Sequence, residues 1–459
     1  MGGIRRPRDK GNRMMKRLKN AIALLLCTVL LSGCQIISTG DDLLQTPKPS
    51  QEYTLLQNKL EQIMGTTMTY AAPQSGSYRN AVTFADIDGE DGKEAIAFLR
   101  DESGGKIYVY AFTKDGDAYQ ELGSVEGPGT AIGAMDFLRV KDGDRRLFTL
   151  TWTLASGVGK GLTVYSIQDG KLKELLDTTC TDYTIADLDQ DGTEELFTLS
   201  YEGTGRKIAQ VYSYADKQMS LLSQAYASQD AQTVANLQAG QLSPDGTQAV
   251  FVDNKIENDN GMQTDIYVLD QKNTTLRNLS QNSGTSTYRA TTLYFCEDIN
   301  GDAAIEVPQP SPDAQDAVHV TDNVLGEASS SDINSLMDWY QFDSSGQAQL
   351  ALTTYKSPTE GWMFKLPTAW RRNVTISTNS GTGVNQTVFT PKGKTTPLLT
   401  IYVFTGDGRE NKAKQQGLLD LGSTSDISYA AKLGSADSEL ALSKKQLEDA
   451  FGVIMNEWS

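Results

Sequence analysis

The feature that most constrains the fold of this chain is a repeat of aspartate- and glycine-rich turns along its middle. The turns are spaced about 45–60 residues apart. Each one follows a strand-like segment and leads into two or three more. The repeated turns are Asp86–Gly92, Asp142–Asp144, Asp187–Gly192, Pro244–Gly246 and Asp298–Asp302. A repeat of this length predicts supersecondary units that stack on their neighbours to bury a continuous core.

A second segment, rich in valine and tyrosine, recurs later in each unit. It occupies Lys106–Phe112, Leu162–Ile167, Ala209–Tyr214, Asp265–Asp270 and Asp338–Phe342. Four short strands in about 50 residues is the unit of a β-propeller blade. We therefore predict a mainly β, propeller-like domain of about five blades over residues 79–356. The alternative is a β-sandwich with irregular strands.

The predicted blades differ in regularity, and the segments that flank them follow other patterns. The blades are expected near residues 79–128, 129–180, 181–231, 232–289 and 290–356. The last contains a polar excursion, Gln309–Ser335, that we expect to be a mobile loop. Residues 51–78 are expected to form a short amphipathic helix, Gln51–Met64, and a lead-in. Residues 357–459 show strands and then a helix over Leu440–Ile454, which predicts a small α+β domain.

The N-terminus has the layout of an export signal. Ala21–Leu31 is an apolar run of eleven residues, whereas spanning a bilayer takes about 20. It follows a basic stretch and ends in small residues, as secretory signals do. Leu31-Ser32-Gly33-Cys34 resembles the lipobox of bacterial lipoproteins. A short membrane helix with a coincidental cysteine is the alternative.

The resemblance to the lipobox implies where the chain resides. It implies removal of residues 1–33 and attachment of lipid, including palmitate-type acyl chains, to Cys34. Residues 34–50, which are polar and contain two prolines, then form a tether. The protein is therefore expected on the extracytoplasmic face of the cell membrane, held there by its lipid.

The charge balance excludes one class of partner. Residues 1–33 carry eight basic residues and one acid, so removing this +7 segment takes the formal charge from −17 to −24. A body this acidic should repel nucleic acid and favour cations.

The strongest local pattern is the turn that begins at Asp187. Asp187, Asp189 and Asp191 alternate along it, Gly192 permits a sharp bend, and Glu195 closes it. Carboxylates at positions 1, 3, 5 and 9, with the carbonyl of the position-7 residue Thr193, can surround one hard cation. An all-oxygen set without thiol or imidazole suits Ca²⁺ in a structural role. A tight Asp/Gly turn that needs no cation is the alternative.

Two further turns repeat this spacing with departures. The expected ligands are Asp298, Asn300, Asp302 and Glu306 in one turn, and Asp86, Asp88, Glu90 and Glu94 in the other. In the turn that begins at Asp298, Ala303 stands at the position where the pattern expects glycine. In the turn that begins at Asp86, glycine comes one position late, at Gly92, so either Glu90 or Asp91 can be the third ligand.

The three loops with the strands before them resemble FG-GAP/VCBS repeats of integrin-type propellers, a resemblance that implies Ca²⁺ at the edges of blades.

The remaining chemistry-bearing residues do not indicate an enzyme. His319, the only histidine, lies in the polar excursion of the last unit, where we expect a solvated side chain; this leaves no Ser-His-Asp or Cys-His constellation of the usual kind. Cys180 and Cys296 are expected to be buried free thiols, with a disulfide between them as the alternative. We therefore expect a non-catalytic binding or scaffolding module for a protein or a glycan. A carboxylate-dependent enzyme acting on envelope or extracellular polysaccharide is the alternative.

Overall fold

The computed structural model describes residues 51–454 except 142–144, 204, 230, 257–259, 271, 273, 282–283, 321–334 and 435–438. The predicted signal, Cys34, the tether and the turn at 142–144 lie outside the described residues. The chain divides into two compact units, Met1–Ile63 and Met64–Ser459. The predicted helix is confirmed as α3 (Gln51–Met64). None of the described helices combines the length and apolar character needed to cross a bilayer.

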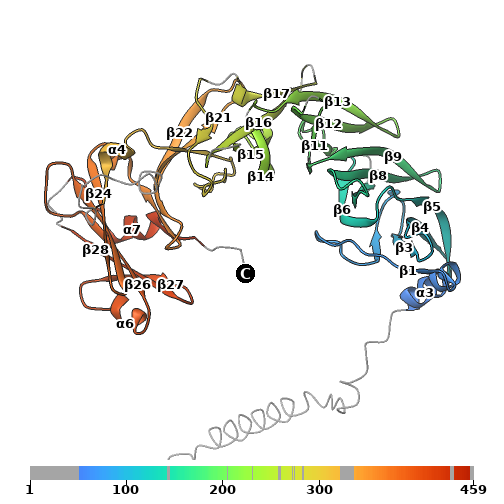
Figure 1. Ribbon diagram of the computed structural model, residues 1–459, viewed down its shortest axis with the longest axis horizontal. Coiled ribbons are helices and arrows are strands. Elements are labelled where there is room, and N and C mark those ends of the chain that lie inside the picture. Colours follow the sequence, from blue (N-terminus) through green and yellow to red (C-terminus); the bar gives the residue numbers. More distant parts are fainter. Residues whose placement is uncertain are drawn as a thin grey trace, which may run out of the picture. The chain divides into compact units, whose positions relative to one another are not determined.

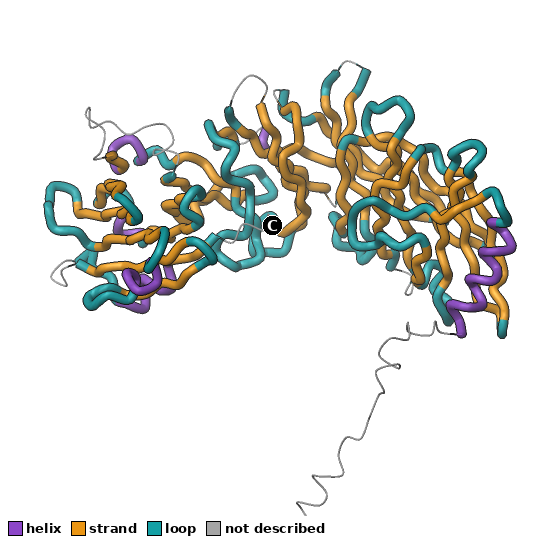
Figure 2. The backbone as a smooth tube through the Cα atoms, turned by 60° about the horizontal axis from the view of Figure 1, so that its bottom comes forward, coloured by secondary structure: helices purple, strands orange, loops and turns teal. Residues whose placement is uncertain are grey.

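Strands make up most of the unit from Met64 onward (Figure 1), and Figure 2 shows how few helical turns interrupt them. Each of its first four sheets is antiparallel and is built from strands that follow one another in the sequence. The first sheet contains β1 (Met68–Tyr70), β2 (Val82–Ala85), β3 (Glu94–Asp101), β4 (Ile107–Asp115) and β5 (Ala118–Glu126); the second contains β6 (Ala131–Arg139), β7 (Arg146–Thr153), β8 (Lys160–Gln168) and β9 (Lys171–Cys180); the third contains β10 (Asp182–Ala186), β11 (Glu195–Tyr201), β12 (Lys207–Ala215) and β13 (Gln218–Tyr226); and the fourth contains β14 (Ala231–Gln241), β15 (Gln248–Ile256), β16 (Met262–Asp270), β17 (Thr275–Asn278) and β18 (Tyr288–Arg289). The predicted mainly β architecture is confirmed.

The repeat seen in the sequence is also present in the hydrogen bonding of the strands. A β-bulge falls between Ala111 and Phe112, between Val164 and Tyr165, and between Val211 and Tyr212, at matching places in three sheets. The last strands of these sheets, β5, β9 and β13, share one alternating pattern of burial. Bulges recur at equivalent positions when the units are related in structure, and a four-stranded antiparallel unit is consistent with a propeller blade.

Consecutive sheets share hydrophobic cores. Phe98 of the first sheet and Trp152 of the second lie in one cluster, and Phe197 of the third and Tyr267 of the fourth lie in another. Strand β8 is buried on both faces because its residues enter the cluster shared with the first sheet and the cluster shared with the third. This mutual burial explains why a single sheet of the repeat has no complete core of its own.

The last two sheets are less regular. The fifth contains β19 (Val307–Pro310), β21 (Leu336–Phe342), β22 (Ala348–Ser357), β23 (Trp362–Leu366) and β29 (Phe451–Val453), in that order; the sixth has the order β20 (Val318–Val320), β24 (Val374–Gly381), β25 (Val384–Pro391), β26 (Leu399–Thr405), β28 (Ile427–Leu433) and β27 (Leu419–Ser423). Because β22 pairs with β23, the fifth sheet continues across residue 356, where we placed the end of the repeat domain. Short helices accompany these sheets: α4 (Ala314–Ala317), α6 (Arg409–Ala413), α7 (Lys444–Ala450) and the 3₁₀ turns η1 (Leu279–Gln281) and η2 (Thr368–Trp370).

Two local predictions near the C-terminus were wrong in extent. The helix expected over 440–454 spans only Lys444–Ala450, because Ser443 and Gln446 form a capping box at its start and Phe451 turns into strand β29. The excursion Gln309–Ser335 is not wholly a loop: Gln309 lies in β19, α4 follows, and β20 pairs in parallel with β24. The early end of the helix and the strands within the excursion both come from pairing with other strands.

Cys180 and Cys296 are both free and buried, as predicted. Burial raises the pKa of the Cys180 thiol to about 12, so the thiol remains protonated and unreactive at neutral pH.

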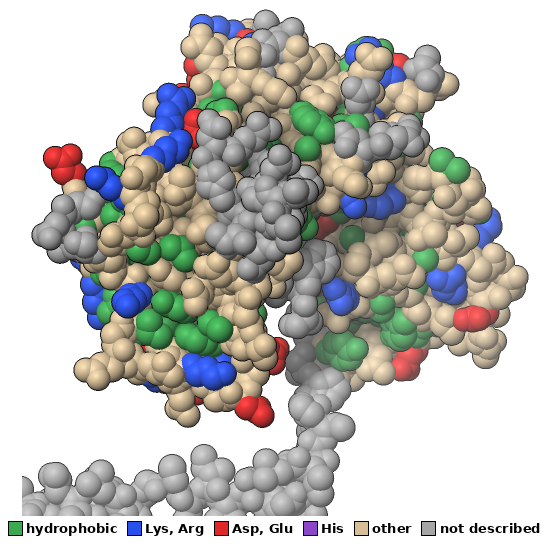
Figure 3. Space-filling view, turned by 60° about the vertical axis from the view of Figure 1, so that its left-hand side comes forward, with side chains coloured by type: hydrophobic (Ala, Val, Ile, Leu, Met, Phe, Trp, Pro, Cys, Tyr) green, Lys and Arg blue, Asp and Glu red, His purple; other side chains and the backbone are tan. Residues whose placement is uncertain are grey.

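On the face drawn in Figure 3, described side chains of both charge signs lie dispersed among neutral ones.

Candidate metal centre

The three acidic loops close in the same way. The last residue of each, Glu94, Glu195 or Glu306, is buried. Its Oε2 atom accepts a hydrogen bond from the backbone N–H of the loop's second residue, seven positions earlier, at 2.8, 2.9 and 3.0 Å in turn. The loops at Asp86 and Asp187 each join two neighbouring strands, β2 to β3 and β10 to β11. The shared closure directs the glutamate's other oxygen into the loop.

The second loop brings three carboxylates together. One oxygen each of Asp187, Asp189 and Glu195 lies within 4.8 Å of the others. Glu195 is only 1% exposed. Its Oε1 atom, like Oδ1 of Asp187, is buried without a hydrogen-bond donor among the described residues. Buried carboxylate oxygens are ordinarily paired, so these orphaned lone pairs fit a bound cation.

Electrostatics in the second loop also favour a cation. Burial, with the nearby charges of Asp189 and Asp187, raises the pKa of Glu195 to about 8, against the hydrogen bond from Leu188. Burial and Asp191 raise the pKa of Asp189. These shifts reflect the cost of concentrating negative charge in a partly dry loop. A divalent cation would remove that cost, and its binding would stabilise the fold.

The first loop holds a similar cluster of Asp86, Asp88 and Glu94. Burial raises the pKa of Glu94, with Asp88 adding repulsion. Oδ1 of Asp86 accepts from the N–H of Gly89 at 2.8 Å, and Oδ1 of Asp88 accepts from the N–H of Glu90 at 2.9 Å. These bonds fix the two aspartates and leave their other oxygens for a ligand.

Not every predicted ligand joins these clusters. Glu90 and Asp191 are exposed, and neither belongs to the group of close carboxylates in its loop. Oδ1 of Asp191 instead accepts a hydrogen bond from the N–H of Thr193 at 2.7 Å. Each cluster therefore supplies positions 1, 3 and 9 of the expected pattern.

The third loop fills the same space with amides. The side-chain amide of Asn300 donates to Glu306 Oε1 at 2.8 Å and to Asp302 Oδ2 at 3.0 Å. Gln341 of β21 donates to the same two oxygens, at 2.7 and 2.8 Å. Asp298 accepts only backbone N–H groups, including that of Ala303. Among the described residues this loop forms no cluster of three close acids, and amide donors occupy the place a cation would take.

The alanine that replaces glycine in the third loop adopts the backbone conformation that glycine would have taken. Ala303 has φ = 75°, and Gly192 of the second loop has φ = 96°. An L-residue with positive φ carries a steric cost of about 1–2 kcal/mol. The loop therefore keeps its shape at the expense of local strain.

Replacing Ala303 with glycine should relieve this strain. We expect Ala303→Gly to raise the free energy of unfolding by about 1 kcal/mol, because the positive φ costs glycine little. Urea unfolding of the full chain in chelator measures the change. Gly192→Ala is the matched control and should lower stability because it places an L-residue at φ = 96°, while its added Cβ meets only ordinary contacts with Lys141. Equal stability of Ala303→Gly and the parent would show that the loop is unstrained.

Sequence reasoning missed one residue that fills the third acidic loop. Gln341 lies 35 residues after Glu306 and enters the third loop from another strand. No local motif marks it, because a glutamine in a strand has no special spacing to the loop that it fills.

No protein-family model matches the sequence, and no curated protein matches it. Solved structures give distant similarities. A protein from Lactobacillus plantarum is 13% identical with a TM-score of 0.27, over 68% of this chain and 81% of that one. A putative 6-phosphogluconolactonase from Bacteroides fragilis is 14% identical with a TM-score of 0.21, over 62% and 93%. The rhamnogalacturonan lyase YesW is 14% identical with a TM-score of 0.23, over 63% of each chain. Similarities this distant carry no information about ligand or reaction.

Proposed function

We propose that this chain is an extracytoplasmic lipoprotein, anchored through Cys34, whose β-sheet body is stabilised by calcium and binds or scaffolds a protein or a glycan. The observation that carries the calcium part is the pair of buried oxygens in the second loop, Glu195 Oε1 and Asp187 Oδ1, that have no donor among the described residues. The anchoring part comes from the lipobox-like sequence ending at Cys34.

Calcium suits the two clusters better than other common metals. Every ligand is an oxygen, and no cysteine or histidine belongs to either described cluster. Zinc and copper favour nitrogen and sulfur, whereas magnesium demands a stricter octahedron. The ion would neutralise the carboxylates and hold together two neighbouring strands of a sheet, which is a structural role.

The absence of a catalytic constellation in the sequence supports binding over catalysis. His319 is the only histidine, and the acids that lie together are arranged to surround a cation. Sheets joined by short turns are well suited to presenting a recognition surface.

Thermal melting of the full chain in detergent tests the calcium part of this proposal. With Ca²⁺ at about 100 times its Kd, each site should contribute about 2.7 kcal/mol relative to chelator. The midpoint should therefore rise by several degrees. The control replaces calcium with sodium chloride of equal ionic strength, since screening alone stabilises an acidic chain. Equal midpoints in calcium and in chelator would refute the proposal.

A further inference from the structure

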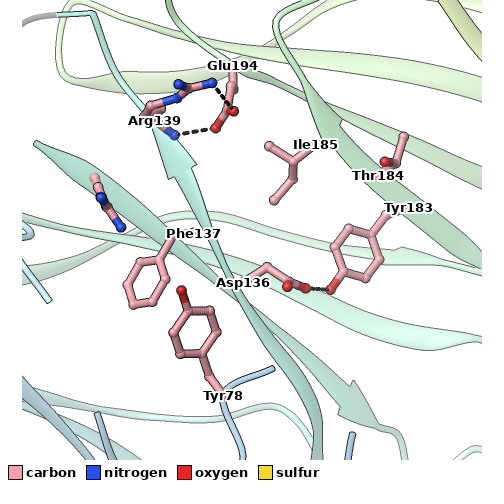
Figure 4. A pocket seen from close by; sticks show the side chains of 9 residues that line it. Tyr78, Asp136, Phe137, Arg139, Tyr183, Thr184, Ile185 and Glu194 are labelled. Atoms are coloured by element: carbon pink, nitrogen blue, oxygen red, sulfur yellow. Dashed lines mark hydrogen bonds and ion pairs between the residues drawn. The ribbon is translucent and has the colours of Figure 1, made fainter. Parts of the chain in front are cut away.

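A cavity of about 620 Å³ lies between the second and third sheets, beside the second acidic loop. Figure 4 shows Asp136 of β6 pointing toward Tyr183 of β10, whereas the ring of Phe137, the next residue of β6, lies beside that of Tyr78. Tyr78, from the segment before β2, also lines it. Its volume is in the range of small-molecule sites, and no metal ligand proposed above lines it.

The two acids in this pocket are already paired. The Tyr183 hydroxyl donates to Oδ2 of Asp136. Burial and the proximity of Asp136 raise the pKa of Tyr183 well above its ordinary value, so the hydroxyl remains a donor. Glu194 forms an ion pair with Arg139 at 2.8 Å and also accepts the Arg139 backbone N–H at 2.7 Å. Neither carboxylate therefore needs a cationic ligand.

One positive charge in the pocket has no partner in the described part of the chain. Arg146 begins β7 and is exposed, and its side chain makes no hydrogen bond or ion pair with any residue that the structure describes. It lies directly opposite Arg139 in the pairing of β6 with β7. Like charges opposite one another in a sheet repel, and Glu194 neutralises only Arg139. Among the described residues the arrangement leaves this guanidinium unmatched, and such a group binds a carboxylate with two parallel hydrogen bonds.

Three half-buried aromatic rings line the same pocket. Tyr78 packs edge-to-face on Phe137, with ring centroids 4.8 Å apart. Tyr183, Tyr78 and Phe137 are each only partly covered by their own hydrophobic clusters. Aromatic surface left open in a pocket offers apolar contact to a ligand ring while its polar tips stay available. Asp136 also keeps one oxygen to accept a hydroxyl.

We propose that this pocket binds a uronic acid unit of a glycan, with Arg146 holding the sugar carboxylate, Asp136 accepting a hydroxyl and the aromatic rings contacting the sugar ring. A simple carboxylate would leave the acceptor and the rings unused, and a neutral sugar would leave Arg146 unmatched. The proposal rests on the binding role proposed above and names its ligand. At physiological ionic strength, charges beyond about 8 Å are screened, so the acidic body does not prevent anion binding at Arg146.

Titration calorimetry tests the pocket with a glucuronate-containing disaccharide, its neutral glucose counterpart and an acetylated glutamate dipeptide. The full chain in detergent should bind the glucuronate disaccharide about tenfold or more tighter than either of the others. Arg146→Gln should weaken that binding about tenfold to a hundredfold. Lys171→Gln, which removes an equal charge from an exposed position on the same sheet, should leave the affinity unchanged.

The outcomes separate this proposal from the calcium-stabilised body. No glucuronate binding, equal binding of the neutral sugar or of the dipeptide, or full affinity in Arg146→Gln would overturn it. Unchanged thermal midpoints of both variants would show that the comparison concerns binding and not folding. A higher melting midpoint in calcium without glucuronate binding would support the calcium proposal and refute the glycan proposal. Glucuronate binding without a calcium effect on the midpoint would support the glycan proposal and refute the calcium proposal.

Discussion

Arg289→Met is expected to lower the free energy of unfolding by about 3–5 kcal/mol, because it leaves a carboxylate buried without its counter-charge. Arg289 and Asp253 are both fully buried and form an ion pair at 2.8 Å. The guanidinium also donates to the carbonyl of Tyr294 at 2.7 Å and to the hydroxyl of Thr264 at 2.9 Å. These bonds fasten the fourth sheet to the segment that enters the third acidic loop. Urea unfolding followed by tryptophan fluorescence measures the effect.

A double-mutant cycle separates the lost charge pair from lost packing. In an Asp253→Asn background the same Arg289→Met change should cost clearly less, because the remaining group is no longer charged. Lys106→Met is the surface control: Lys106 pairs with Glu126, but both side chains are about half exposed, and such pairs contribute about 0–1 kcal/mol. A loss below about 1 kcal/mol in Arg289→Met would mean that Asp253 is not charged when buried.

The sequence predicted those parts of the fold whose signals are local. Turns such as Asp187–Gly192 and strands such as Ala209–Tyr214 repeat at short range, so the sheets could be located before their packing was known. The thiols Cys180 and Cys296 could be predicted to be free because the repeat places them in units that are not adjacent. Local periodicity is enough when a unit is formed by consecutive strands.

The parts that could not be predicted depend on partners far apart in the chain. Strand β29 completes the fifth sheet by pairing with β23, about 90 residues earlier. That pairing ends the C-terminal helix early. Arg289 and Asp253 lie in separate strands with no motif between them. Such contacts are decided by tertiary packing, which overrides local propensity.

In the candidate site, too, the residues close in sequence could be predicted and the residues brought in from other strands could not. The spacing of Asp187, Asp189 and Glu195 identified a cluster because alternate residues of a tight loop face one point. The spacing alone could not reveal that Gln341 fills the corresponding space in the third loop. Arg146 escaped notice because an exposed arginine in a strand is ordinary until its neighbours are known to be paired.

Glu195→Gln is expected to remove the calcium stabilisation of the second loop while leaving the calcium-free protein at least as stable as the parent. The neutral side chain keeps an oxygen for the N–H of Leu188, as Glu195 does now. Its amide can donate to Asp187 Oδ1, which has no donor among the described residues. The third loop already uses this solution through Asn300. In calcium, the variant should lose that site's contribution of about 2.7 kcal/mol at 100 times the Kd.

The same variant should change the pH dependence of stability in chelator. The pKa of Glu195 in the folded state is about 8, above its ordinary value of 4.5. Between these values the folded parent holds a proton that the unfolded chain has released, so stability falls as pH rises. Glu195→Gln removes this group, and its stability should fall less from about pH 5 to pH 8. Melting curves across this range measure the difference.

The matched control is Glu306→Gln, which alters the corresponding buried residue of the third loop. That loop has amide donors in place of close acids, so the difference in stability between calcium and chelator should stay at the parent's value even if the variant is less stable in both. Adding Glu94→Gln to Glu195→Gln should abolish the difference, because it removes the buried acid of the other cluster. If Glu195→Gln kept the parent's full response to calcium, the ion would bind elsewhere on the acidic surface, and the orphaned oxygens of the second loop would require another explanation.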